Sequence, residues 1–90
     1  MATLRVVASR EQVSTCLGPE VAILNLTSGM YCTLNRTGAR IWEMLSRPVQ
    51  VDSLVEAIVN EFGIARAQAD IDVTRFVTEL LELRLVETAP

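Results

Sequence analysis

The sequence predicts an α+β protein in which a three-stranded antiparallel sheet, about residues 13–34, precedes three helices, about residues 35–84. Short β-prone runs separated by glycine-containing turns fill the first part of the chain, which is typical of an antiparallel meander. After residue 35, apolar residues recur at helical spacing, which is typical of amphipathic helices. The 90 residues allow one hydrophobic core, so we expect residues 1–90 to form a single domain.

Three β-prone runs predict the sheet. Val13–Leu17 alternates large apolar with small polar residues, which is typical of a half-buried strand. Val21–Leu26 is almost continuously apolar, interrupted only by Asn25, and is the predicted central strand. Met30–Leu34 returns after a short glycine-containing turn and is expected at one edge. An earlier run, Thr3–Ala8, fits either a strand or an extended arm.

The first helix is expected to begin after Asn35, whose side chain can accept hydrogen bonds from the first turn. Thr37 is the competing N-cap residue. The helix should end near Ser46, because Arg47 precedes Pro48 and a residue before proline is pushed out of the α region.

Two further helices follow. Asp52 and the capping-box pattern Ser53–Glu56 predict the start of the second helix, and Gly63 predicts a left-handed stop. The third is expected over about residues 66–83. Leu85 and Val86 should then pack against the body of the protein before a frayed end.

Composition argues against several classes of function. The chain has 8 Arg, no Lys or His, 11 acidic residues and a net charge of −3, whereas a protein that binds nucleic acid is expected to carry a basic stripe. Half of the residues are hydrophobic, and the mean hydropathy is +0.33. So small a protein cannot bury all of these residues deeply, and we expect some apolar surface to face a partner.

The residues needed for chemistry are scarce. Without His or Lys, the thiols of Cys16 and Cys32 lack their usual activating partners, and two cysteines are too few for a metal motif. No glycine-rich loop indicates a phosphate-binding cofactor site. We therefore expect a protein that is not an enzyme and holds neither metal nor cofactor. With no signal sequence or membrane-spanning run, we expect a cytoplasmic protein whose cysteines are reduced and buried, although a disulfide is an alternative.

One long segment resembles a known family. Residues 21–45 read VAILNLTSGMYCTLNRTGARIWEML, an apolar strand, a T-x-G turn, an aromatic strand and then L-N-x-T-G-x-x-I-W. This order is similar to the signature of the PqqD family. The similarity continues through Phe62-Gly63, then Asp72-Val73 with Phe76-Val77-x-x-Leu80, and the closing Leu85-Val86, so that it covers residues 13–86.

The resemblance carries expectations about fold and function. The family includes the pyrroloquinoline-quinone chaperone and the stand-alone recognition proteins of lasso-peptide clusters, together called RiPP precursor recognition elements. It implies a three-stranded sheet and three helices in a winged-helix-like arrangement. It also implies that the leader segment of a ribosomal precursor peptide binds as an added strand, between the third strand and the third helix. The bound peptide would then pass to a separate leader peptidase and a cyclase.

Placed on this sequence, the family's binding site predicts two groups of peptide-contacting residues. The edge strand would contribute Met30, Tyr31, Cys32, Thr33 and Leu34. The third helix would contribute Asp70, Val73, Thr74, Val77 and Leu81. Val73 and Val77, with Leu80, fit a plain core stripe equally well, and the L-N-x-T-G segment is interpreted as a helix cap and a close packing contact.

Three alternatives stay open at this stage. A pyrroloquinoline-quinone peptide chaperone would serve a radical enzyme instead. A small winged-helix DNA-binding protein would need a basic third helix, but Arg66, Arg75 and Arg84 are spread among four acidic residues. A thiol redox enzyme would need an activated cysteine. The expected partners are thus a leader peptide and its processing enzymes, with no nucleic acid and no membrane, and a homodimer through the open sheet edge is a further candidate.

Overall fold

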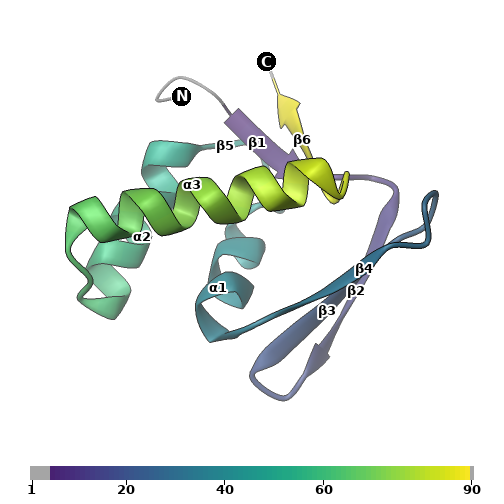
Figure 1. Cartoon of the computed structure of the whole chain (residues 1–90), viewed down its shortest axis with the longest axis horizontal. Coiled ribbons are helices and arrows are strands. Elements are labelled where there is room, and N and C mark those ends of the chain that lie inside the picture. Colours follow the sequence, from purple (N-terminus) through teal and green to yellow (C-terminus); the bar gives the residue numbers. More distant parts are fainter. Residues whose placement is uncertain (1–4, 90) are drawn as a thin grey trace.

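The computed structural model describes residues 5–89, which form three helices and two three-stranded antiparallel sheets (Figure 1). The mixed α+β class is therefore confirmed, and one sheet more is present than the sequence predicted. The elements are β1 Arg5–Ala8, β2 Gln12–Leu17, β3 Glu20–Asn25, β4 Tyr31–Leu34, α1 Arg36–Met44, β5 Val49–Gln50, α2 Val51–Phe62, α3 Arg66–Glu82 and β6 Val86–Ala89.

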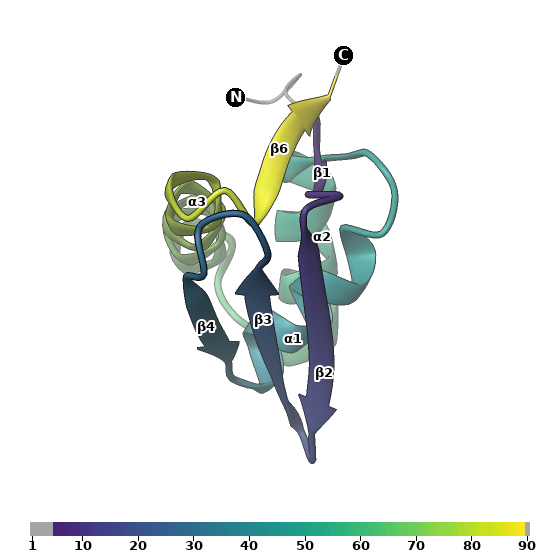
Figure 2. The same cartoon turned by 90° about the vertical axis from the view of Figure 1, so that its right-hand side faces the viewer.

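The predicted sheet has the strand order β2-β3-β4, with β3 in the centre. The register pairs Ile23 with Cys32 on one side and with Ser14 on the other. The helices cover one face of this sheet, and Ile23 is buried beneath them, 1% exposed. Figure 2 shows β4 as the edge strand on the side of α3, and β2 as the opposite edge.

The second sheet, in the order β5-β1-β6, was not predicted. Residues 5–8 are a strand paired with both β5 and β6, so the choice between strand and arm resolves in favour of a strand for the described part of the run. Thr3 and Leu4 lie outside the described residues. Leu85 and Val86 are buried as expected, but the frayed end is wrong, because β6 continues to Ala89 and pairs with β1.

Helix ends agree with the prediction where a local cap decides them. Asn35 caps α1, its Oδ1 accepting from the backbone N–H of Gly38 at 2.9 Å, and Gly63 ends α2 with φ of 65°. The predicted capping box is wrong: α2 starts earlier, at Val51, because β5 leads directly into it. Likewise α1 ends at Met44 rather than near Ser46.

One core lies between the helices and the two sheets. It combines side chains from β1, β3, β4, α1, α2, α3 and β6, and the contribution of β4 is Leu34. On α3, Val73, Val77 and Leu80 are each 1% exposed or less, so these three residues are core residues. Burial of side chains of this size stabilises a fold by about 1.5–3 kcal/mol each, which fixes α3 against the body of the protein.

The C-terminal end of α3 closes with a Schellman motif. Leu85 N–H donates to the Leu80 carbonyl at 2.9 Å, and Arg84 N–H donates to the Leu81 carbonyl at 3.1 Å. Arg84 takes the left-handed conformation with φ of 58°, a position that glycine usually occupies. A side chain there costs about 1–2 kcal/mol of backbone strain.

We therefore expect Arg84→Gly to stabilise the protein. Relief of that strain should exceed the extra entropy of glycine in the unfolded chain, about 0.4–1 kcal/mol, and leave a net gain of about 0.5–1 kcal/mol in urea unfolding. Arg75→Gly, in the regular part of the same helix, is the matched control and should lose about 1 kcal/mol. A loss of stability in Arg84→Gly similar to that control would contradict the assignment.

Candidate functional site

The outer side of β4 carries backbone groups that its neighbour strand does not use. Asn25 N–H donates to the Met30 carbonyl, and Leu26 N–H donates to the Glu11 carbonyl, both at 2.8 Å. Because bonding alternates along an antiparallel strand, odd-numbered residues of β3 bond to β4 and even-numbered ones bond to β2. The register then directs the N–H and C=O groups of Cys32 toward β3, and those of Tyr31 and Thr33 toward the open edge.

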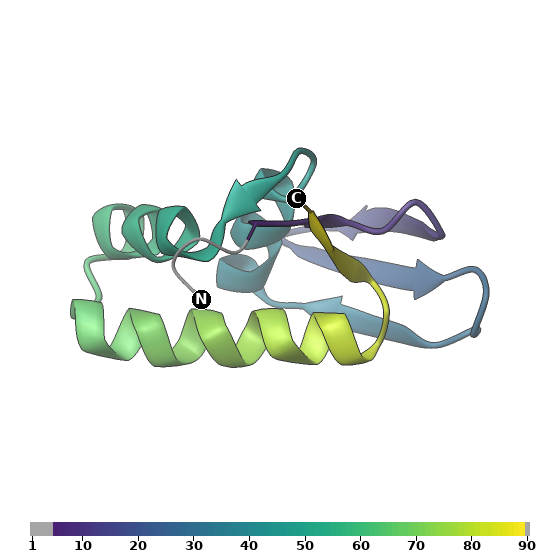
Figure 3. The ribbon, with the colours of Figure 1, turned by 90° about the horizontal axis from the view of Figure 1, so that it is seen from above.

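A groove runs between this edge and α3. It has a volume of about 210 Å³ and is lined by Cys32, Thr33, Leu34, Asn35, Phe76, Glu79, Leu80 and Leu83. Figures 2 and 3 both show β4 as the strand of its sheet that lies nearest to α3. The edge therefore opens beside a mostly apolar wall rather than into bulk solvent.

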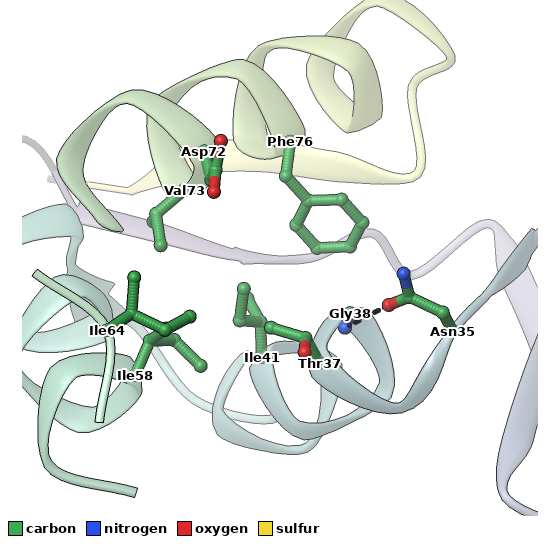
Figure 4. A pocket seen from close by; sticks show the side chains of 9 residues that line it. All are labelled: Asn35, Thr37, Gly38, Ile41, Ile58, Ile64, Asp72, Val73 and Phe76. Carbon is green, nitrogen blue, oxygen red and sulfur yellow. Dashed lines mark hydrogen bonds between the residues drawn. The ribbon is translucent and has the colours of Figure 1, made fainter. Parts of the chain in front are cut away.

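A second pocket, of about 270 Å³, lies next to the groove and shares Asn35 and Phe76 with it. Figure 4 shows the Phe76 ring and Val73 projecting from α3 toward Ile41 of α1. The remaining walls are Thr37, Gly38, Ile58, Ile64 and Asp72. Its apolar lining with a carboxylate beside it is suited to a largely apolar side chain.

The L-N-x-T-G segment builds the corner between groove and pocket. A Cβ atom at Gly38 would lie 3.3 Å from the Leu34 Cβ and 3.3 Å from two Phe76 ring atoms. Glycine thus allows α1, β4 and α3 to approach each other closely, and the Asn35 cap fixes the start of α1. This supports the interpretation of the segment as a cap and a packing contact.

The groove is acidic where it is charged. Glu79 lines it, and Asp72 lies along the same row of α3 in the neighbouring pocket. No arginine lines either cavity within residues 5–89. Burial, and secondly the charge of Glu79, raise the pKa of the Cys32 thiol.

The two cysteines do not form a disulfide and differ in environment. Cys32 is half-buried in the groove, while Cys16 is exposed, so the expectation that both are buried is wrong for Cys16. Reactive thiols have a lowered pKa, whereas that of Cys32 is raised. Cys32, the cysteine that lies in the groove, is therefore not the activated thiol that a redox enzyme would need.

The predicted edge residues fall on different faces. Cys32 and Leu34 face the groove, and Thr33 lines it. Tyr31, 72% exposed, lies on the outer face of the sheet with Val13 and Leu24. Met30 precedes β4, which starts one residue later than predicted, and is exposed.

The predicted helix residues are more widely separated. Val73 and Val77 are buried, and Val73 also forms part of the wall of the second pocket. The structure does not bring Asp70, Thr74 and Leu81 to the groove. With 3.6 residues per turn, these three lie about half a turn around α3 from the residues that line it. Their contact with a peptide stays a prediction.

Sequence reasoning missed the row of α3 that does line the cavities: Asp72, Phe76, Glu79 and Leu83. Their spacing of four, three and four residues is itself a helical face. The signal is present in the sequence, because Leu83 falls outside the buried stripe and Phe76 lies at its margin. Asp72 and Glu79 obscure this signal, because charged residues in the row are typical of a solvent-exposed helix face.

Within the described part of the chain, no helix is long and apolar enough to cross a membrane. Across the same residues, no group of three or more His, Cys, Asp or Glu side chains could hold a metal ion. The site so described consists of an open strand edge, a groove and an adjoining pocket.

Comparison with known proteins assigns this arrangement to a family. The family model described as coenzyme PQQ synthesis protein D (PqqD) matches residues 20–86, and the chain belongs to the PqqD family. No match was found among curated proteins.

Two solved structures are similar. TbiB1, in complex with the TbiA(beta) leader peptide, is 31% identical with a TM-score of 0.83, over 90% of this chain and 94% of that one. A lasso peptide synthetase B1, complexed with the leader peptide, is 24% identical with a TM-score of 0.78, over 94% of this chain and 98% of that one. At this identity the second structure supports the fold.

The raised pKa of Cys32 predicts slow alkylation that rises with pH, because a raised pKa leaves less thiolate at a given pH. Glu79→Gln removes the nearby charge, lowers the pKa of Cys32 and should speed its reaction with iodoacetamide at pH 8. The measurement uses Cys16→Ser, so that Cys32 alone is counted. Cys16, measured in Cys32→Ser, should not respond to Glu79→Gln. A Cys32 rate that is unchanged or slower in Glu79→Gln would contradict this account.

Proposed function

We propose that this protein binds the leader segment of a ribosomally made precursor peptide by β-strand addition to β4. It then delivers the peptide to a separate leader peptidase and a cyclase in lasso-peptide biosynthesis. TbiB1, which shares the fold and 31% of its aligned residues, was solved with a leader peptide, and this likeness supports the proposal. Membership of the PqqD family is consistent with it.

The open edge of β4 carries the proposal. Tyr31 and Thr33 offer two N–H and two C=O groups in the spacing that an added strand requires. β4 has no charged residue and no proline, the usual means by which proteins block such edges. The edge of β2 is also uncharged, but only β4 lies beside a groove formed with α3.

In an added strand, the pleat would place successive side chains on opposite faces of the sheet. Successive residues would point alternately to the outer face, next to Tyr31, and inward, into the groove with Cys32 and Leu83. The inward residues meet apolar walls with Glu79 among them, so we expect apolar side chains accompanied by a basic or hydrogen-bond-donating one. The backbone bonds would supply affinity, and the groove and pocket would supply specificity.

On this proposal the protein is a non-catalytic partner. It positions the peptide, and the chemistry belongs to the enzymes that receive it. Two free cysteines are consistent with a reducing compartment, and we place this step in the cytoplasm. A second copy could pair with the same open edge, in which case the leader peptide and the homodimer would compete.

The alternative, a pyrroloquinoline-quinone peptide chaperone working with a radical enzyme, has the description of the family model in its favour. The 31% identity to TbiB1, which was solved with a leader peptide, supports leader binding, and the lasso peptide synthetase B1 shares the fold. Both alternatives use the same edge, so peptide binding is tested first and the client enzyme second.

Thr33→Pro should weaken binding of the cognate leader peptide at least tenfold, because proline removes an outward N–H and its ring blocks the approach of a partner strand. An unmade backbone hydrogen bond with its buried partner left unsatisfied costs about 1–3 kcal/mol, and 1.4 kcal/mol is tenfold in Kd. Isothermal titration calorimetry measures the change. Proline at position 32 is unsuitable, because the N–H of Cys32 bonds to β3 and its loss would disturb the sheet itself.

Two controls accompany this variant. Thr33→Val keeps the N–H and the shape and should bind as the wild type does. Cys16→Pro places the same change on the opposite edge, where the N–H also faces outward, and should leave leader affinity unaltered. Leader affinity retained by a folded Thr33→Pro protein would refute strand addition at β4.

A further inference from the structure

We propose that Asn25 is a positioning residue that sets the spacing between the two walls of the groove. Its buried side chain, 2% exposed, joins the loop before β4 to the C-terminal end of α3. This inference rests on the proposed function, because it concerns how the groove is kept ready for a leader peptide.

Every hydrogen-bonding position of the Asn25 amide is used. Nδ2 donates to the Arg84 carbonyl at 2.9 Å and to the Leu83 carbonyl at 3.3 Å. Oδ1 accepts from the backbone N–H of Thr27 at 2.8 Å and of Ser28 at 3.0 Å. Two donors and two acceptors are all that a primary amide offers, so asparagine fits this site completely.

The groups that it joins belong to opposite walls. On the strand side, Asn25 also holds the loop through its backbone, its N–H donating to the Met30 carbonyl and its carbonyl accepting from Gly29. Met30 leads directly into β4. On the helix side, the two carbonyls belong to Leu83, the C-cap residue of α3, and to Arg84, the residue after it, and Leu83 itself lines the groove. Those carbonyls have no partner within the helix, which makes the amide their cap.

The groove is thus fixed at two ends. At one end, Gly38 allows Leu34 and Phe76 to pack closely, with 3.3 Å from the position of a Cβ to each. At the other end, the amide of Asn25 links the loop to the helix. Within residues 5–89, no other side-chain hydrogen bond connects the segment 25–34 to α3 or its C-terminal cap.

A groove with fixed walls costs less to occupy. A leader strand needs β4 and α3 at one separation, so that backbone bonds and inward side chains fit together. We call the two hydrogen bonds from Asn25 Nδ2 to the Leu83 and Arg84 carbonyls the Asn25 clasp. If the clasp holds that separation before the peptide arrives, binding does not have to order the walls. Loss of the clasp should therefore appear as faster leader dissociation rather than as slower association.

Asn25→Asp tests the clasp selectively. The carboxylate keeps both acceptors for Thr27 and Ser28 but loses both donors to α3, so the loop is retained and the link is broken. We expect leader affinity to fall at least tenfold, chiefly through the dissociation rate measured by surface plasmon resonance. Asn25→Ala, which adds no charge, should show the same direction of change.

Val55→Ala is the control for a general loss of stability. Val55 is buried in α2 and lines neither the groove nor the neighbouring pocket. With its melting temperature lowered to a similar extent, it should bind the leader as the wild type does at a temperature where both proteins are folded. A folded Asn25→Asp protein that binds as tightly as the wild type overturns the inference. So does an equal loss in Val55→Ala.

If Asn25→Asp does not fold, the substitution is made in the Arg84→Gly background, which is expected to be more stable. Residue 84 keeps its backbone carbonyl there, and the strain of a side chain at positive φ is removed. The same comparison with Val55→Ala then applies in that background.

A failure of the proposed function can be told apart from a failure of this inference. If the wild type binds no leader peptide, the proposed function fails, and the clasp is judged without peptide. Asn25→Asp should then still shift the amide resonances of Cys32–Leu34 and speed hydrogen exchange at Leu83–Leu85. Unchanged shifts and exchange in the folded variant would overturn the positioning role.

Discussion

The site depends on the alternation of backbone bonding along an antiparallel strand. Because β3 pairs with β4 through its odd-numbered residues, half of the polar backbone groups of β4 are satisfied and the other half face outward. The neighbour on that side is α3, whose backbone groups are used within the helix and cannot complete the sheet. A helix beside an edge strand therefore leaves the edge open, and the side chains of the helix form one wall of the groove.

Local signals in the sequence were sufficient for much of this. The apolar run at β3 predicted the central strand, Asn35 predicted the start of α1, and Gly63 predicted the end of α2, since each is decided by a residue and its near neighbours. The second sheet had no such signal. β5 is two residues long, and β6 is only four residues long and half polar, so both are strands only because β1 lies between them.

The site divides in the same way. The open edge followed from the hairpin, and the register then showed that Tyr31 and Thr33, rather than Cys32, offer the free groups. The helix contacts could not be taken from the buried stripe, because groove residues such as Phe76 and Glu79 lie beside that stripe. Asn25 was visible only as an interruption of an apolar strand; its bonds reach carbonyls 58 and 59 residues away, which no local pattern reports.

The central claim is that a leader peptide completes the sheet at β4, and residue-resolved hydrogen exchange tests it most directly. Addition of saturating leader peptide should slow exchange at the amides of Tyr31 and Thr33, which are free in the unbound protein. Cys32, already bonded to β3, should change little, and so should Ser14 on the opposite edge. Unchanged exchange at Tyr31 and Thr33 with the peptide bound would contradict the account.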